Sequence, residues 1–477
     1  MIKKIVYKSF AFLLLFVFAT SCKIQQQAIK TESKKVPVNF DGYSSDSTSI
    51  ADLNWKKYFA DENLIALIDT ALRRNQELNI TIQEIEISKN EVRARKGEYL
   101  PFVGIRAGAG VEKVGEYTRN GAVEKNLEIK PETKFPEPLP DYMVGVFASW
   151  ELDVWKKLRN AKKSAALRYL ASVEGRNFMM TNLIAEIANS YYELMALDNL
   201  LDIVQRNIQI QTDALEIVRQ QKDAAKLTQL AVNRFEAQLL NTKGLQYDII
   251  QRRVETENRI NFLTGSFPKT ILRSSAGFND ITVDSTDAGI PSQLLSNRPD
   301  IRQAELQLAA AKVDVKVARA NFYPSFGITA GAGFQAFNIA YLITPESMLY
   351  NLAGDLMAPL INRNAINAAY NSANARQAQE VYNYERTILN AYVEVVNQLS
   401  KVQNFSKSYE TKSKEVDILT QSIVISNSLF RSARADYVEV LLTQREALES
   451  KMELIEIKVK QMNAKVNIYK ALGGGWN

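Results

Sequence analysis

The sequence contains no histidine, and its only cysteine is Cys22. Without histidine, the chain lacks the commonest general base and the commonest ligand for transition metals. One thiol cannot form a disulfide or a thiolate cluster within one chain. Glycine and proline are gathered in a few clusters, whereas helix-forming residues dominate. This composition favours an elongated helical protein over a string of compact domains, and it argues against an enzyme.

Charge gives no support for nucleic-acid binding. The formal net charge of +6 is modest for 477 residues, and it includes three lysines among the first eight residues. The sequence shows no concentrated basic face. We therefore expect no nucleic-acid partner.

The N-terminus has the pattern of a secretory signal peptide. The basic start is followed by an apolar run at residues 10–18, too short to span a bilayer as a mature helix, and then by small residues. We interpret residues 1–21 as a lipoprotein signal peptide and Cys22 as the residue that receives an N-acyl and an S-diacylglycerol lipid. The alternative is a buried cysteine without this role. Residues 22–50, rich in Gln, Lys and Ser, are expected to form a flexible lipid-anchored tether.

The chain contains an internal duplication. Residues 101–110 recur as residues 324–333, with the proline and every glycine in register, and residues 187–194 resemble residues 388–395. Each copy is expected to run helix, strand, loop, strand, very long helix, turn and helix. The first repeat covers residues 51–275, and the second covers residues 276–477.

Each repeat contains two β segments with a period of two residues. Along residues 144–150, for example, alternate side chains fall on opposite faces, as they do in barrel strands that separate lipid from a lumen. The polar residues 112–140 and the more apolar residues 337–345 are expected to be exposed loops. The predicted strands lie at about 102–112, 142–152, 325–336 and 347–358.

Helices are expected over most of the remaining sequence. Residues 360–472 contain neither Gly nor Pro. We predict two long helical hairpins, at about 155–264 and 360–472, and a helix of about 70 residues would be on the order of 100 Å long. A coiled-coil seam is predicted from apolar residues spaced mostly three or four apart: Ile184, Ile187, Tyr191, Leu194, Leu201, Val204 and Ile208.

Five short motifs in this order resemble the TolC-type outer-membrane factors, which are outer membrane efflux proteins. The resemblance covers nearly the whole mature chain and is greatest for the NodT or CusC-like lipoprotein branch of RND efflux systems. The motifs are Trp-Lys-Lys-Tyr-Phe-Ala-Asp at 55–61, Asn-Phe-Leu-Thr-Gly at 261–265, Arg-Pro-Asp-Ile at 298–301, Phe-Tyr-Pro-Ser at 322–325 and Tyr-Lys-Ala-Leu-Gly-Gly-Gly-Trp at 469–476.

The resemblance implies a mainly α fold with membrane β structure. Each subunit of a TolC-like homotrimer would give four strands to a twelve-stranded β-barrel and its coiled-coil helices to an α-helical periplasmic tunnel. Unpaired strand edges are costly in hydrocarbon, which supports closure by further copies. The implied function is a passive outer-membrane conduit that works with a periplasmic adaptor and an inner-membrane pump of the RND type.

The resemblance also implies that the turns of both hairpins dock an adaptor. The family has glycine in these turns, where this chain has Ala225 and Ala433. The replacement makes a tight left-handed turn less easy. The alternative is that the turn residues are only solvated. The candidate docking residues are Lys226, Leu227, Arg434 and Ala435.

The stretch after the second turn resembles the segment that forms the closed entrance in TolC. Glu439 stands at one acidic gate position, and Leu442 occupies the other. We assign Glu439 and Asp436 to a periplasmic gate. Three Glu439 carboxylates around one axis would attract cations and repel one another. The alternative is a charge on a solvated helix face.

Three other functions compete with an efflux channel. A periplasmic adaptor lipoprotein would show a single hairpin between β-rich modules, but here the hairpin and the strands are duplicated. A structural coiled-coil lipoprotein would have no use for glycine-rich strand pairs. An enzyme is least expected, because carboxylates such as Glu186, Glu193 and Glu394 are interpreted as solvated helix faces. The sequence does not specify the cargo, which could be a drug, a metal ion or a dye.

Overall fold

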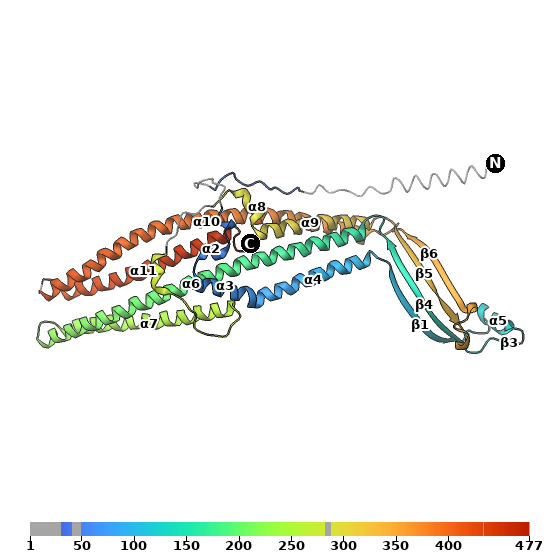
Figure 1. The fold of residues 1–477 in the computed structure, drawn as a ribbon, viewed down its shortest axis with the longest axis horizontal. Helices are drawn as coiled ribbons and strands as arrows, with labels where there is room; N and C mark the ends of the chain where they lie inside the picture. The colour runs from blue at the N-terminus through green and yellow to red at the C-terminus, as the bar shows by residue number, and fades with distance from the viewer. Residues whose placement is uncertain (1–29, 41–48, 282–287, 433, 477) are drawn as a thin grey trace.

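A computed structural model describes residues 30–40, 49–281, 288–432 and 434–476. The molecule is elongated, with a β-sheet at one end and long helices that extend to the other end (Figure 1). The predicted signal peptide and lipidation site, Cys22, lie outside the described residues, as does Ala433.

Four long strands form one antiparallel sheet in the order β1-β4-β5-β6. They are β1 (Phe102–Glu112), β4 (Leu139–Leu152), β5 (Ser325–Ala336) and β6 (Met348–Met357), close to the four predicted ranges. The central β4–β5 pair joins the two repeats. There Gly145 lies opposite Gly333, and a Cβ atom on Gly333 would meet the Val144 carbonyl oxygen at 2.4 Å. The outer strands β1 and β6 each have an unpaired edge within the chain.

The connections at the far end of the sheet are partly folded. The segment between β1 and β4 contains α5 (Arg119–Asn126), β2 (Glu128–Lys130) and β3 (Thr133–Lys134). Thr118 caps α5 by accepting a hydrogen bond from the Gly121 amide. The segment between β5 and β6 contains two short 3-10 helices, η4 (Ile339–Tyr341) and η5 (Pro345–Ser347). The first of these segments is therefore more ordered than the expected loop.

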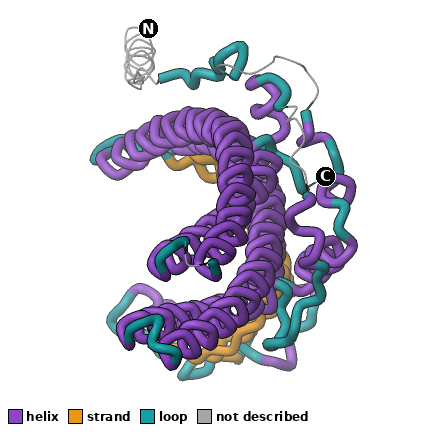
Figure 2. The backbone as a smooth tube through the Cα atoms, turned by 90° about the vertical axis from the view of Figure 1, so that its left-hand side faces the viewer, coloured by secondary structure: helices purple, strands orange, loops and turns teal. Residues whose placement is uncertain are grey.

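Two long hairpins form the other end of the molecule. They are α6 (Lys157–Asp223) with α7 (Gln229–Leu263), and α10 (Asn364–Arg431) with α11 (Tyr437–Ala471). The helices lie side by side in an open arc, in which α6 and α11 are the inner neighbours and α7 and α10 are the edges (Figure 2). The predicted seam on α6 is confirmed, because every member is buried except Ile208, which is half-buried.

Short helices cover the middle of the long ones. A core formed by η1 (Ile50–Asp52), α2 (Trp55–Phe59) and α3 (Glu62–Arg74) packs on α6 and α11. Next to the sheet, α4 (Gln76–Glu98) packs on α6, whereas α9 (Pro299–Ala320) packs on both α6 and α10. The connecting segments are η2 (Ser275–Asp280), η3 (Pro291–Gln293) and α8 (Leu294–Asn297).

Residues 30–40, which we call the strap, correct the expectation of a flexible tether. Lys30 and the Ser33 amide both bond Glu385 of α10, the amide at 3.1 Å. Glu32 pairs with Lys312 of α9 at 2.6 Å. Phe40 is buried and stacks on Tyr392 with 5.6 Å between ring centroids. Complementary charges and one buried aromatic ring therefore hold this part of the segment against α9 and α10.

The last long helix of each repeat ends in the same backbone motif. We call the segments around these two helix ends the first junction and the second junction. At the first junction, α7 ends in a Schellman motif with Gly265 at φ 63°. Asn75 donates to the Leu263 carbonyl at 2.9 Å and accepts from the Leu78 amide. One side chain thus caps the end of α7 and the start of α4.

The second junction places an arginine where the first has asparagine. Here α11 ends in the same motif with Gly473 at φ 93°, and Arg298 donates to the Ala471 carbonyl at 2.7 Å. The guanidinium also binds Asp300 at 2.8 Å and Glu394 at 2.9 Å. Burial lowers the pKa of Arg298, but these two carboxylates outweigh it and hold the pKa above its ordinary value. Interpreting Glu394 as a merely solvated charge was therefore wrong.

The register between the repeats also needs a correction. The likeness between residues 187–194 and 388–395 suggests that these segments are equivalent. Both α6 and α10 run from the sheet to the tips, yet residue 388 lies about two helical turns farther from the end of α10 than residue 187 lies from the end of α6. A shift of two turns returns side chains to nearly the same helix face, so the pattern alone conceals it.

Candidate functional site

The first hairpin tip is a Schellman motif built with alanine. The Lys226 amide donates to the Gln221 carbonyl, and the Ala225 amide donates to the Lys222 carbonyl, each at 2.9 Å. Ala225 has a φ of 58°, so the left-handed turn forms without glycine. Lys226 is exposed, and Leu227 is half-buried.

The second tip follows the same plan. The Arg434 amide donates to the Leu429 carbonyl at 2.9 Å, which is the bond that closes the first tip as well. Arg434 is exposed and Ala435 is half-buried. Each tip therefore presents an exposed cation followed by a half-buried small or apolar residue.

An apolar cluster near the tips connects the first hairpin with the start of α11. Leu215 and Val218 of α6 pack with Phe235 of α7, and Leu227 lies against them. Tyr437 and Leu441, on the first turns of α11, pack against the same cluster. The sequence analysis missed this contact, although the apolar spacing of Tyr437 and Leu441 was a usable signal. The cluster brings the start of α11, with its acidic residues, next to the first tip.

Asp436 and Glu439 both stand at the start of α11. Asp436 is the N-cap residue, and Glu439 lies in the first turn, where a carboxylate interacts favourably with the helix dipole. Both side chains are exposed, and the Glu439 amide donates to the Asp436 carbonyl at 3.1 Å. The structure thus places both predicted gate residues beside the tips, with carboxylates accessible to ions.

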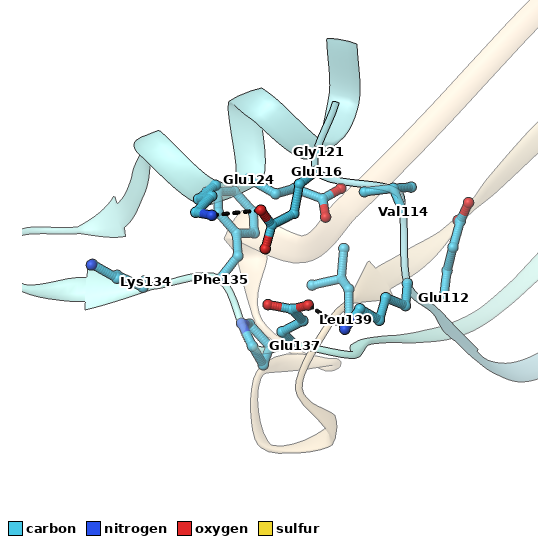
Figure 3. Close-up of a pocket in the computed structure, with 12 residues that line it drawn as sticks. Glu112, Val114, Glu116, Gly121, Glu124, Lys134, Phe135, Glu137 and Leu139 are labelled. Atoms are coloured by element: carbon cyan, nitrogen blue, oxygen red, sulfur yellow. Dashed lines mark hydrogen bonds and ion pairs between the residues drawn. The ribbon is translucent and has the colours of Figure 1, made fainter. Parts of the chain in front are cut away.

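A pocket of about 150 Å³ lies far from the tips, between the β1–β4 connection and the end of the sheet (Figure 3). Its walls carry both signs of charge. Lys113 pairs with Glu137 at 2.7 Å, and Lys125 pairs with Glu116 at 2.6 Å. All four side chains are at least half exposed, so each pair stabilises the connection only weakly.

In the described part of the chain, no group of three or more Cys, Asp or Glu side chains has the geometry to hold a metal ion. None of its helices combines the length and the apolar character needed to cross a membrane.

Comparison with known proteins identifies the fold and the family. The model of the family described as "Outer membrane efflux protein" matches residues 67–266 and 290–474. The open-state crystal structure of the MtrE outer membrane channel from Neisseria gonorrhoeae is similar, with a TM-score of 0.83 and 23% sequence identity over 96% of this chain and 99% of that one.

Two curated relatives span nearly the same length. The solvent efflux pump outer membrane protein SrpC of Pseudomonas putida is 27% identical over 471 residues, covering 98% of this chain and 97% of its own. The probable outer membrane lipoprotein SilC of Salmonella typhimurium is 26% identical over 431 residues, covering 90% of this chain and 89% of its own.

Proposed function

The chain belongs to the outer membrane efflux protein family and is an outer-membrane channel subunit of an efflux pump, and we propose that three copies close around one axis to form the conduit. One observation carries the proposal. At three levels of the molecule, a contact between the first and second repeat inside the chain has a counterpart that is left unmade at its two open edges. A ring is the arrangement in which every such contact is made.

The β-sheet gives the simplest example of a contact that is left unmade. Within the chain, β4 of the first repeat pairs with β5 of the second, whereas β1 and β6 each keep one edge without a partner strand. Pairing β6 with β1 of the next copy would satisfy both edges, and four strands from each of three copies would make a twelve-stranded barrel. Unpaired backbone groups in hydrocarbon cost several kcal/mol each, so the sheet is unstable in a membrane until it closes.

The helices next to the sheet, α4 and α9, give a second example of an unmade contact. In the second repeat α9 packs on α6, with the Ser164 hydroxyl donating to the Ala310 carbonyl. Counted from the proline that follows each helix, Ile87 of α4 stands in the place of Ala310. Ile80 and Ile87 are 59% and 68% exposed. We infer that α4 uses this face to pack on α10 of the next copy.

The edges of the hairpins carry matching apolar stripes. On α7, Leu240, Tyr247 and Val254 recur every seven residues and are 62%, 70% and 42% exposed. On α10, Ile418 and Ile425 have the same spacing and are 64% and 59% exposed. A seven-residue apolar repeat is the seam of a coiled coil. We infer that α7 and α10 of adjacent copies form such a seam.

The mass of the detergent-solubilised protein and its conductance in planar bilayers test the proposed conduit together. Three copies per particle and discrete ion-conducting steps are expected. Tyr247→Lys, which places a charge in the α7 stripe, should reduce the trimer fraction, whereas Asn241→Lys, at an exposed residue of the same helix about 100° away from the stripe, should not. A compact monomer that passes no ions would refute the proposal.

Adaptor docking at the tips is a second part of the proposal. The exposed cations Lys226 and Arg434, with Leu227 and Ala435 beside them, support it. The motifs of the lipoprotein branch favour an inner-membrane pump of the RND type. Co-purification of the host's periplasmic adaptor with the channel should fall in the double variant Lys226→Glu/Arg434→Glu. The matched change Lys460→Glu, at an exposed lysine of α11 far from the tips, should leave it unchanged, and equal recovery from both would refute docking at the tips.

The gate and the lipid are the remaining parts. The exposed position of Glu439 beside the tips supports a carboxylate ring at the entrance. Glu439→Ala should lower cation preference and divalent-ion block, whereas Glu456→Ala, a change of an exposed carboxylate on a different face of α11, should alter neither. For Cys22, mass spectrometry should find the N-acyl and S-diacylglycerol lipid, and Cys22→Ser should release the protein from the anchor. An unmodified mature Cys22 would refute lipidation.

A further inference from the structure

The first junction carries an apolar groove that the chain itself leaves open. The groove has a volume of about 300 Å³, and Asn75, Glu77, Phe262, Gly265 and Phe267 are among the residues that line it. Phe267 is 94% exposed and Phe262 is 69% exposed. Two phenyl rings this exposed at one site indicate a surface that another apolar group covers.

The second junction shows what covers such a surface. There the segment after Gly473 is buried against α6 of the first repeat. A Cβ atom on Gly475 would lie 3.6 Å from the Thr181 Cα and 3.5 Å from the Ile184 Cδ1. The neighbouring Trp476 donates from its indole nitrogen to the Asn297 carbonyl at 3.0 Å. The segment therefore lies in a contact between the two repeats.

The repeats specify the equivalent residues at the open edge. Counted from the glycine of each Schellman motif, Phe267 stands in the place of Gly475. Counted from the tip ends of α6 and α10, Leu389 and Tyr392 stand in the places of Thr181 and Ile184. Leu389 is 62% exposed on the free edge of α10. Phe267 follows α7 and Leu389 lies on α10. Because α7 and α10 are the two edges of the arc (Figure 2), these residues do not meet within one chain.

We propose that the groove of the first junction binds α10 of a second copy, with Phe267 against Leu389 and Tyr392. This contact rests on the proposed trimer and specifies its register at the middle of the channel. A head-to-tail contact of this kind closes when three copies complete a ring. In the closed ring, the groove of each copy is covered by α10 of one neighbour, and its own α10 covers the groove of the other neighbour.

The strap becomes part of the same contact. Phe40 stacks on Tyr392, and the Tyr392 hydroxyl donates to the Asn39 carbonyl at 3.3 Å. The second copy's Phe267 therefore lies next to the end of the strap. Because the strap follows the predicted lipidation site, the anchor segment of one copy borders the joint between two copies. Assembly would thus be sensitive to the seating of this segment.

A disulfide cross-link tests the contact directly. At the corresponding place within the chain, a Cβ on Gly475 would lie 3.6 Å from the Thr181 Cα. The backbones at this contact are therefore close, and a disulfide requires Cα atoms within about 7 Å of each other. The double variant Phe267→Cys/Leu389→Cys should, after mild oxidation, run as covalent dimers and trimers on a denaturing gel. Reduction should return it to monomers. Each single variant controls for pairing with the native Cys22 and should remain monomeric.

A second cysteine pair tests the register. Tyr382 is 59% exposed on the same face of α10 as Leu389, about two turns nearer the sheet. The sequence likeness between the repeats would pair it with Phe267, whereas the helix ends favour Leu389. Phe267→Cys/Tyr382→Cys should give little cross-linked product. Cross-linking of this pair in place of the other would overturn the proposed register.

The native mass and the dissociation temperature of the trimer distinguish a failure of this contact from a failure of the proposed conduit. A trimer that gives neither cross-link would refute this contact and leave the proposed conduit intact, whereas a protein that never forms trimers would refute both. Phe267→Lys should also lower the temperature at which trimers dissociate in detergent, with circular dichroism unchanged because Phe267 is exposed in the single chain. Tyr117→Lys, at an exposed residue of the β1–β4 connection, should have no such effect, and an equal effect of both would contradict the contact.

Discussion

The two junctions end their helices with the same hydrogen bonds but differ in what lies around them. At the second, the chain after Gly473 is buried and Arg298 gathers two carboxylates and a carbonyl. At the first, Asn75 makes neutral bonds, and Phe267 faces solvent. The second junction lies between two repeats of one chain, whereas the first lies at an open edge. In the proposed ring this difference follows from position, because a single chain can complete only one of two equivalent contacts.

The largest expected effect on stability comes from removing the side chain that caps the helix end at each junction. Arg298→Met leaves Asp300 and Glu394 without their buried cation and should cost about 3–5 kcal/mol of unfolding free energy. Asn75→Ala removes a neutral cap and should cost about 0.5–2 kcal/mol. Denaturant unfolding in detergent measures both. Equal losses would show that the charges add nothing to the second junction.

The segment that leaves the first junction is held by a different ion cluster. Arg273 donates to Asp198 at 2.9 Å and to Glu257 at 2.6 Å, and Ser275 donates to Asp198 at 2.6 Å. Burial raises the pKa of Asp198, but Arg273 and Ser275 outweigh it, so the pKa lies below its ordinary value. The resulting stabilisation is present above the unfolded pKa of about 3.9 and is lost as pH falls through the folded value.

The variant Asp198→Asn tests whether the ion cluster beside the first junction makes stability depend on pH. The variant should lose about 1.5–3 kcal/mol at pH 7, which is the range for hydrogen bonds to charged groups. Its stability should then fall less steeply than that of the wild type below about pH 4. Acid titration of the unfolding free energy measures the two slopes. Parallel curves would mean that Asp198 does not contribute to acid stability.

The glycines of the two junctions provide the next test. A Cβ atom would meet the Asn297 carbonyl oxygen at 2.5 Å in Gly473→Ala and the Arg74 carbonyl oxygen at 2.5 Å in Gly265→Ala. Both positions also have positive φ, so each change should cost at least about 1–2 kcal/mol. Similar losses, measured by thermal unfolding, would confirm that the junctions share one backbone design. A neutral Gly265→Ala would restrict that design to the second junction.

Local patterns in the sequence were enough to predict several elements. The period of two and the repeated glycines located β1 and β5, and the apolar spacing located the α6 seam. Tertiary contacts were less visible. The Arg298 motif was recognised, but its partner Glu394 lies far along the chain and reads as an ordinary helix-face charge. The fold of the β1–β4 connection depends on a local cap at Thr118, and the repeat register depends on helix ends, which similar heptads conceal.

The smallest predicted effect contrasts the tips with the junctions. Ala225 adopts the left-handed conformation that glycine adopts at both junctions, but its neighbours leave it exposed, so only the backbone conformation opposes a side chain there. Ala225→Gly should remove a conformational cost of about 1–2 kcal/mol, offset by about 0.4–1 kcal/mol from the greater freedom of glycine in the unfolded chain. The net gain should lie between about 0 and 1.6 kcal/mol and be confined to the tip. Hydrogen exchange should therefore slow at the Lys226 amide, which closes the motif, and stay unchanged at the Gly474 amide, which closes the second junction. Faster exchange at Lys226 would mean that alanine fits this turn better than glycine, and the parallel between tips and junctions would then end at their hydrogen bonds.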